Sequence, residues 1–241
     1  MKYLSRRDLE AIATRVVRAY WRLPKAQNEP LRIVPEILLT EMLGLTIDYR
    51  HLSKDRQLLG MTCFSETGVE VFDSTLEDFF FLDGKSVLIE SDLRGPSAVP
   101  GRRNFTIMHE GCHHVLFMLF PDDYKEGINT RRVFVYRETG NKVAADYWVE
   151  WQTDTLASAI LMPPDLLRRN MALCGIPSGI PILNQIWRLR DYEKFTLLSD
   201  MMGVSKQALS IRLKQLGLIG RDDRSNPNRL LDIFKEDDEI D

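Results

Sequence analysis

The chain has 241 residues, of which 44% are hydrophobic and 28% are charged, and its net charge at pH 7 is -3. These proportions are typical of a globular protein with a sizeable core, and they exclude fibrous, collagen-like and low-complexity proteins. The slightly negative charge excludes a chain-wide positive field for nucleic acid or an anionic membrane, so any such binding must be local.

Targeting signals and disulfides are also not expected. The N-terminal residues lack the apolar core of a signal peptide, and no run reaches the roughly 18 apolar residues of a membrane-spanning helix. Cys63, Cys112 and Cys174 are too few and too scattered for a disulfide framework or a cysteine-only metal site. We therefore expect a cytoplasmic protein without membrane contact.

The first ninety residues begin helical and then change to strands. Apolar residues recur at helical intervals over residues 8–23, and a second, shorter helix is expected over residues 33–43. Residues 45–49 resemble a strand, and short β-branched and aromatic runs predict further strands at 60–64, 69–72 and 87–89. We expect the runs between residues 59 and 90 to form a small antiparallel sheet.

Helices dominate the remainder of the chain. A helical pattern runs from residue 104 to about 120, where Pro121 ends it, and another covers residues 144–161 before Pro163 and Pro164. Residues 131–137 are either a strand or an exposed loop. The order of helices, strands and helices predicts an α+β fold.

The helix over residues 104–120 carries an H-E-x-x-H motif, formed by His109, Glu110 and His113. In this composition the motif would occur by chance roughly 0.005 times. Residues four apart share one helix face, so His109 and His113 can direct ring nitrogens at one zinc ion. Glu110 can then reach a water on that ion and act as the general base. His114 points about 100° away from the pair, and we do not expect it to be a ligand.

A third zinc ligand must come from elsewhere, because catalytic zinc usually has three protein ligands and a water. A metzincin site is excluded, since Leu116 and Leu119 stand where that class has glycine and histidine. Glu150 on the later helix is the predicted third ligand, and Asp154, one turn further, is predicted to hold a histidine ring. The alternative for these two acids is a solvated pair on a helix surface.

These roles predict hydrolysis of a peptide bond. Zinc lowers the pKa of its water towards about 7, and Glu110 takes the proton and later gives it to the leaving amine. We expect the substrate to bind along residues 86–90 as the edge strand, and a tyrosine or arginine to stabilise the oxyanion.

Two stretches resemble the ImmA/IrrE family of metallo-endopeptidases. Residues 104–113, N-F-T-I-M-H-E-G-C-H, are similar to the family pattern R-F-T-x-A-H-E-x-G-H, and residues 150–163, E-W-Q-T-D-T-L-A-S-A-I-L-M-P, are similar to its second motif. The resemblance implies that Glu150 binds the metal, in a gluzincin-like domain that cleaves a helix-turn-helix repressor and so relieves repression. Asn104, Met108 and the pair Gly111-Cys112 depart from the pattern, and Cys112 bears on packing beside the site more than on zinc binding.

Residues 195–217 predict a helix, a turn at Gly203 and a second helix capped by Ser205, a helix-turn-helix arrangement. Five polar side chains of this segment could contact DNA, although they are a modest set in an acidic chain: Lys206, Gln207, Ser210, Arg212 and Lys214. We therefore favour a structural or repressor-docking role for the segment.

The predicted organisation is a zincin-like metallopeptidase domain at residues 1–190, a helix-turn-helix-like segment at 191–220 packed on it, and an acidic, partly disordered tail at 221–241. The first functional hypothesis is a zinc endopeptidase that acts on a DNA-binding repressor. The second is a helix-turn-helix transcription regulator with structural or sensory zinc. Glu110 favours the first hypothesis, because a structural zinc site has no need of a spare carboxylate.

Overall fold

The computed structural model describes residues 3–72, 78–95, 98–122, 133–137 and 147–228. The chain forms two compact units, Met1–Pro163 and Pro164–Asp241. This boundary lies earlier in the chain than the expected one at residue 190. Its physical reason is the proline pair: proline interrupts a helix, whereas it is tolerated in the first turn of a new one.

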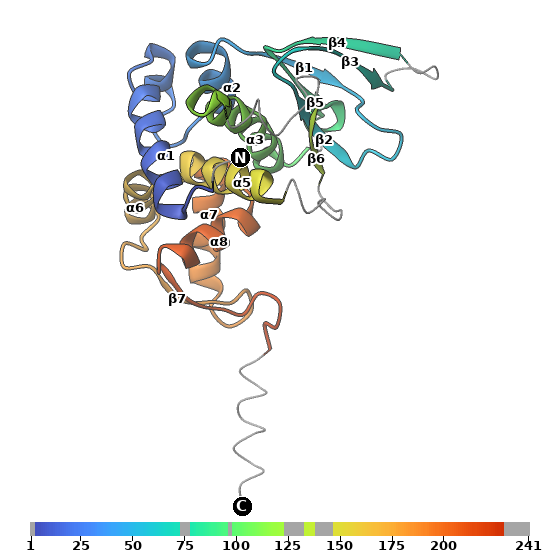
Figure 1. Cartoon of the computed structure of the whole chain (residues 1–241). Coiled ribbons are helices and arrows are strands. Elements are labelled where there is room, and N and C mark those ends of the chain that lie inside the picture. Colours follow the sequence, from blue (N-terminus) through green and yellow to red (C-terminus); the bar gives the residue numbers. More distant parts are fainter. Residues whose placement is uncertain (1–2, 73–77, 96–97, 123–132, 138–146, 229–241) are drawn as a thin grey trace, which may run out of the picture. The chain divides into compact units, whose positions relative to one another are not determined.

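The helices of the first unit surround α3 (Pro100–Leu119), the predicted motif helix (Figure 1). α5 (Tyr147–Leu161) packs against both α3 and α1 (Arg6–Tyr20). α1 begins with a reciprocal cap, in which the Ser5 hydroxyl accepts from the Asp8 backbone N–H and the Asp8 carboxylate accepts from the Ser5 N–H. The remaining helical segments are short: η1 (Pro24–Asn28), α2 (Pro35–Ile37), the π-helical η2 (Leu38–Met42) and η3 (Ser91–Arg94).

A four-stranded sheet supports α3, in the order β1 (Thr46–Arg50), β5 (Ser86–Glu90), β2 (Leu58–Thr62), β6 (Phe134–Arg137). The pair β2–β5 is antiparallel as expected, and β6 adds a further antiparallel pair with β2, but β1–β5 is parallel, so the sheet is mixed. The prediction that residues 86–90 form the edge strand is wrong. β5 lies between β1 and β2 and is buried throughout, as the unbroken apolar run Val-Leu-Ile allows.

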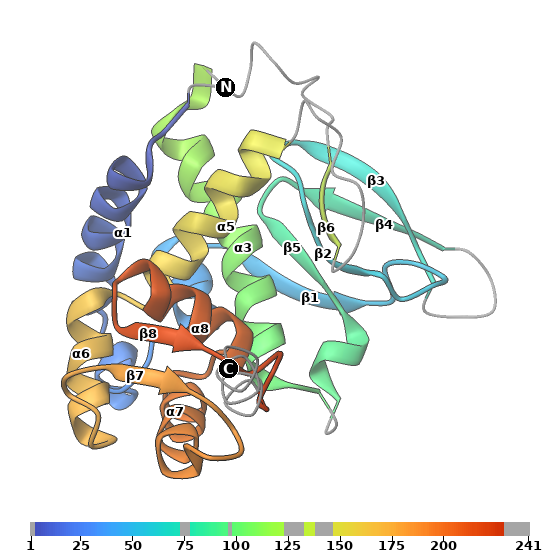
Figure 2. The ribbon, with the colours of Figure 1, turned by 90° about the horizontal axis from the view of Figure 1, so that it is seen from below.

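A hairpin of β3 (Glu66–Val71) and β4 (Asp78–Asp83) forms a separate two-stranded sheet. Its inner side chains share a core cluster with Met61 and Leu88 of the larger sheet. The neighbouring strand positions Gly60 and Thr62 approach α3 instead. Since successive side chains of a strand point to opposite faces, the hairpin covers the face away from α3 (Figure 2).

The second unit contains α6 (Pro164–Leu173), β7 (Ile180–Leu183), α7 (Leu189–Met202), α8 (Lys206–Gln215) and β8 (Ile219–Asp222). α7 ends at Gly203 with a φ of +66°, and the Ser205 hydroxyl accepts from the Ala208 N–H to cap α8. β7 and β8 pair in parallel. β8 occupies the start of the expected tail, whereas residues 229–241 lie outside the described residues.

Several polar side chains that could contact DNA by their residue type are engaged within this unit. Arg212 and Ser210 are each only 1% exposed. Lys214 forms an ion pair with Asp222, with 2.9 Å between Nζ and Oδ2. Lys206 lies over the ring of Tyr192, 5.1 Å from its centroid. Among the described residues, no helix combines the length and the apolar character needed to cross a membrane.

Candidate metal centre

The predicted ligands meet where α3 packs against α5. His109 and His113 project from α3 and are 0% exposed, and Glu150 comes from the first turn of α5 and is 8% exposed. A solvated acidic pair on α5, the alternative considered for Glu150 and Asp154, does not fit the burial of Glu150. These three side chains form a buried group that could hold a metal ion.

The donor atoms lie at the separations that a zinc ion requires. The two Nε2 atoms of His109 and His113 are 3.2 Å apart. Glu150 Oε2 is 3.3 Å from His109 Nε2, and Oε1 is 3.5 Å from His113 Nε2. Ligand atoms bound to tetrahedral zinc at about 2.0–2.1 Å lie roughly 3.3–3.4 Å apart. Two imidazoles and a carboxylate, already at these distances, fit one zinc ion.

Hydrogen bonds behind the histidines orient their rings. Asp154 Oδ1 lies 2.9 Å from Nδ1 of His109, so this nitrogen can donate to the carboxylate and leave Nε2 facing the group. Thr153 Oγ1 lies 3.4 Å from Nδ1 of His113 and donates to the carbonyl of Val149 at 2.9 Å. The sequence indicated the place of Asp154, whereas nothing in its pattern singled out Thr153.

The carboxylates of Asp154 and Glu150 favour the protonated, positively charged form of His109. Burial alone would lower the pKa of His109, but hydrogen bonds to Asp154 and Glu150 outweigh it and raise this pKa to about 10. Burial lowers the pKa of His113 to about 3, so that ring is neutral at pH 7. A bound cation would satisfy the same carboxylates that hold the proton on His109.

The carboxylate of Glu110 is fully buried, and neither of its oxygens has a hydrogen-bond partner among the described residues. Burial raises its pKa to about 8; the charge of His109 lowers it, and those of Glu150 and Asp154 raise it further. A buried polar group without a partner is costly and uncommon in native proteins. Glu110 therefore has the character of a group whose partner is a water or a ligand.

Gly60 of β2 provides the space for Glu110. A Cβ atom at position 60 would lie 2.9 Å from Cγ of Glu110 and 2.9 Å from Cγ2 of Thr106. No other residue type could occupy position 60 without moving the α3 side chains. The strand thereby fixes the position of the carboxylate beside the metal group.

Two aromatic rings of β6 cover the histidines. The Tyr136 ring lies 4.3 Å from that of His109, and the Phe134 ring lies 4.5 Å from that of His113, measured between centroids. The sequence left residues 131–137 undecided between strand and loop, so both rings were missed. In the described sheet β6 is an edge strand, the position that was wrongly assigned to residues 86–90.

The other histidines lie outside this group. Nε2 of His114 is 2.7 Å from Oγ1 of Thr62, and His114 is 6% exposed. Nδ1 of His51 is 2.6 Å from Oε1 of the buried Glu90, which also accepts from the Leu52 N–H.

The departures at positions 111 and 112 leave the group intact. A Cβ at Gly111 would lie 2.5 Å from Cδ1 of Leu39, so Gly111 allows the close approach of α3 and η2. Cys112 is fully buried, and burial raises the pKa of its thiol well above the usual range. A protonated, inaccessible thiol is neither a ligand nor a redox centre.

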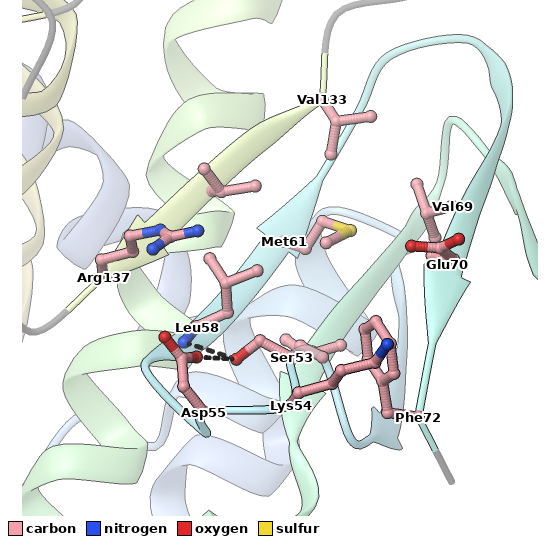
Figure 3. A pocket seen from close by; sticks show the side chains of 12 residues that line it. Ser53, Lys54, Asp55, Leu58, Met61, Val69, Glu70, Phe72, Val133 and Arg137 are labelled. Carbon is pink, nitrogen blue, oxygen red and sulfur yellow. Dashed lines mark hydrogen bonds between the residues drawn. The ribbon is translucent and has the colours of Figure 1, made fainter. Parts of the chain in front are cut away.

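A pocket of about 610 Å³ lies on the opposite face of the sheet, bordered by Leu58, Met61 and the hairpin (Figure 3). Val135 and Arg137 of β6, and Val133 just before the strand, line the pocket, whereas Phe134 and Tyr136 face the histidines. The pocket is therefore separate from the metal group.

No protein-family model matches the chain, and a search of curated proteins finds no match.

Proposed function

We propose that the chain is a zinc-dependent endopeptidase. The observation that carries the proposal is the trio of donors 3.2–3.5 Å apart with an unpartnered, buried carboxylate next to them in the chain. When bound to His109, His113 and Glu150, zinc would polarise a peptide carbonyl and lower the pKa of a water. A structural zinc site would gain nothing from the buried carboxyl group of Glu110.

Glu110 moves the proton in this proposal. One of its oxygens accepts a proton from the attacking water and then donates it to the nitrogen of the leaving amine. Its burial supports this role, because an unsolvated carboxylate binds a proton more readily than an exposed one. In this proposal Asp154 holds the orientation of the His109 ring during the reaction, and the absence of a side chain at Gly60 leaves space for the Glu110 carboxylate.

β6 is the proposed binding strand for the substrate. It lies at the edge of the described sheet and places Tyr136 over His109. An extended peptide can pair with such an edge through backbone hydrogen bonds. The phenol of Tyr136 is then a candidate donor to the oxygen of the polarised carbonyl, a role for which the sequence predicted a tyrosine or arginine.

The proposed substrate is a helix-turn-helix repressor. The two motifs around His109 and Glu150 resemble a family with that activity, and a zinc peptidase inside a cell must be narrowly specific. α7 and α8 are proposed to contact such a partner rather than DNA, because Arg212 and Lys214 are engaged within their own unit.

The test is co-expression with a helix-turn-helix repressor, taken first from the genes that adjoin this one, followed by mass spectrometry of the fragments. The parent should cleave the repressor, and Glu110→Gln should leave it intact while retaining one zinc per chain by elemental analysis. If the repressor stays intact with the parent as well as with Glu110→Gln, under the inducing condition, the proposed substrate is wrong. Cleavage by Glu110→Gln near the parental rate would refute the mechanism.

A further inference from the structure

The outer face of the β3–β4 hairpin exposes two phenylalanines. Phe79 and Phe81 are 63% and 77% exposed, and they lie two residues apart in β4, so both point to the same side. In the strand register Phe81 is opposite Gly68, and Phe79 is opposite Glu70. The hairpin thus presents two large aromatic rings to solvent beside a glycine and an acid.

Folding of the hairpin does not require these rings. The alternate side chains Val69, Val71 and Leu82 are 7%, 3% and 1% exposed, and they belong to the core cluster shared with the larger sheet. Phe80, between the two exposed rings, packs against that cluster. Paired aromatic rings that the core does not use are typical of interaction surfaces.

The hairpin is also strongly acidic. Residues 66–83 contain six Asp and Glu residues and no Lys, Arg or His. Glu66 and Glu70 are exposed on β3, and Glu66 is directly opposite Asp83. Two carboxylates therefore stand at neighbouring positions on this face, and a positively charged partner could pair with both.

We propose that the outer face of the hairpin, formed by Glu66, Gly68, Glu70, Phe79 and Phe81, is a docking surface for an arginine-rich protein segment. A guanidinium group can stack on a phenylalanine ring and pair with a carboxylate at the same time. A contact between a guanidinium group and a phenylalanine ring is already present on the inner side of the hairpin, where the Arg50 guanidinium lies 5.1 Å from the centroid of Phe80. Nucleic acid and anionic lipid are unfavourable occupants, since both are negatively charged.

The role of this surface in substrate selection rests on the proposed function. DNA-binding proteins carry Lys and Arg to neutralise phosphates, so a repressor offers the required charge. The larger sheet separates the hairpin from the metal group, and one stretch of partner cannot occupy both. The hairpin would therefore hold the substrate at a place remote from the bond that is cut.

Binding is tested apart from cleavage by fluorescence anisotropy in the Glu110→Gln background. The probe is a labelled peptide of alternating Arg and Leu, compared with peptides in which Ser replaces Leu or Glu replaces Arg. We expect the Arg-Leu peptide to bind at least about tenfold more tightly than either, a difference of about 1.4 kcal/mol. Two double variants should each weaken binding of the Arg-Leu peptide about tenfold or more: Phe79→Ser with Phe81→Ser, and Glu66→Lys with Glu70→Lys.

The matched control is Val99→Ser with Met118→Ser, at two apolar residues that are 58% and 56% exposed outside the hairpin. This pair should bind the peptide like the parent. Equal binding by the parent and by both hairpin variants would overturn the proposal. Self-association of the parent that Phe79→Ser with Phe81→Ser abolishes would also overturn it, because the occupant would then be a second copy.

Cleavage of the repressor provides the second readout. The hairpin variants should raise KM about tenfold and leave kcat unchanged, since they remove binding remote from the reacting groups. Hairpin-dependent peptide binding without any cleavage would support docking and refute the peptidase. If both hairpin variants cleave the repressor with an unchanged KM, the surface has no role in substrate selection. That result would leave peptide docking itself untouched.

Discussion

The position of the Glu110 carboxylate, the proposed general base, depends on a residue without a side chain. Gly60 lies against Glu110 so closely that an added Cβ would meet its Cγ at 2.9 Å. The same Cβ would also lie 2.9 Å from Cγ2 of Thr106, so a side chain at position 60 would press on two residues of α3. Sequence alone could not indicate this, since Gly60 is 50 residues away from the motif and falls within a strand pattern.

Gly60→Ala is expected to displace Glu110 and to lower kcat by about 10²-fold, the usual effect of a catalytic group misplaced by about 1 Å. Zinc content should not change, because the atoms nearest to a Cβ at position 60 belong to Glu110 and Thr106 and not to the predicted ligands. Steady-state cleavage and elemental analysis measure the two quantities. The double variant with Glu110→Gln should be no slower than Glu110→Gln alone, and additive losses would show that Gly60 acts elsewhere.

Asp154 is expected to influence metal binding through the His109 ring. Asp154→Ala removes the carboxylate 2.9 Å from Nδ1, so the ring loses both its orientation and some of its basicity. We expect zinc affinity to fall about 10–100-fold, measured by competition with a chelator. Asp200→Ala, at an exposed acid of the second unit, is the control and should bind zinc normally. An unchanged affinity in Asp154→Ala would exclude the orienting role.

At the scale of elements, the sequence predicted α3 and α5 because each has a long helical pattern, and the H-E-x-x-H spacing needs only helix geometry. The pairing of Glu150 with the histidines depended on motif resemblance as well. The sequence leaves β6 undecided between strand and loop and does not predict β4, for different reasons. β6 is four residues long, and β4 contains three consecutive phenylalanines that do not alternate with polar residues. Strand order, which placed β5 at the centre, depends on long-range pairing that local patterns do not show.

β8 carries a carboxylate that should make the second unit sensitive to acid. Asp222 accepts from Arg224 at 2.9 and 2.8 Å and pairs with Lys214 at 2.9 Å. Burial alone would raise the pKa of Asp222, but the hydrogen bonds from Arg224 and Lys214 outweigh it and hold this pKa far below its usual range. The resulting stability is complete above the unfolded-state pKa of about 3.9 and is lost as the pH falls towards the folded-state pKa.

Asp222→Asn should therefore reduce the free energy of unfolding of the second unit at pH 7 by about 2 kcal/mol, the usual contribution of charged hydrogen bonds. The difference between parent and variant should shrink as the pH is lowered below 4. Hydrogen exchange of the α8 amides in urea measures it. A difference that stays constant between pH 7 and pH 3 would show that the charge of Asp222 does not stabilise the unit.

At the scale of the whole molecule, the metal group belongs to one unit. His109, His113 and Glu150 all precede Pro163, so every predicted zinc ligand lies in the first unit. A ligand that binds only the folded state stabilises it by about 2.7 kcal/mol at a free concentration of 100 Kd. This stabilisation should appear in the unit that holds the ligand, because the bound ion links α3 to α5.

Zinc is accordingly expected to slow hydrogen exchange in α3 and α5 by up to about 100-fold, the factor that corresponds to 2.7 kcal/mol. The amides of α7 and α8 should exchange at the same rate with and without zinc. Mass spectrometry of peptides from both units, after chelation and after zinc is restored, measures the contrast. In His113→Ala the zinc-dependent protection of α3 should disappear, since one of three ligands is missing. Protection confined to the second unit, or protection that persists in His113→Ala, would place the zinc at a different site and remove the basis for the proposed peptidase.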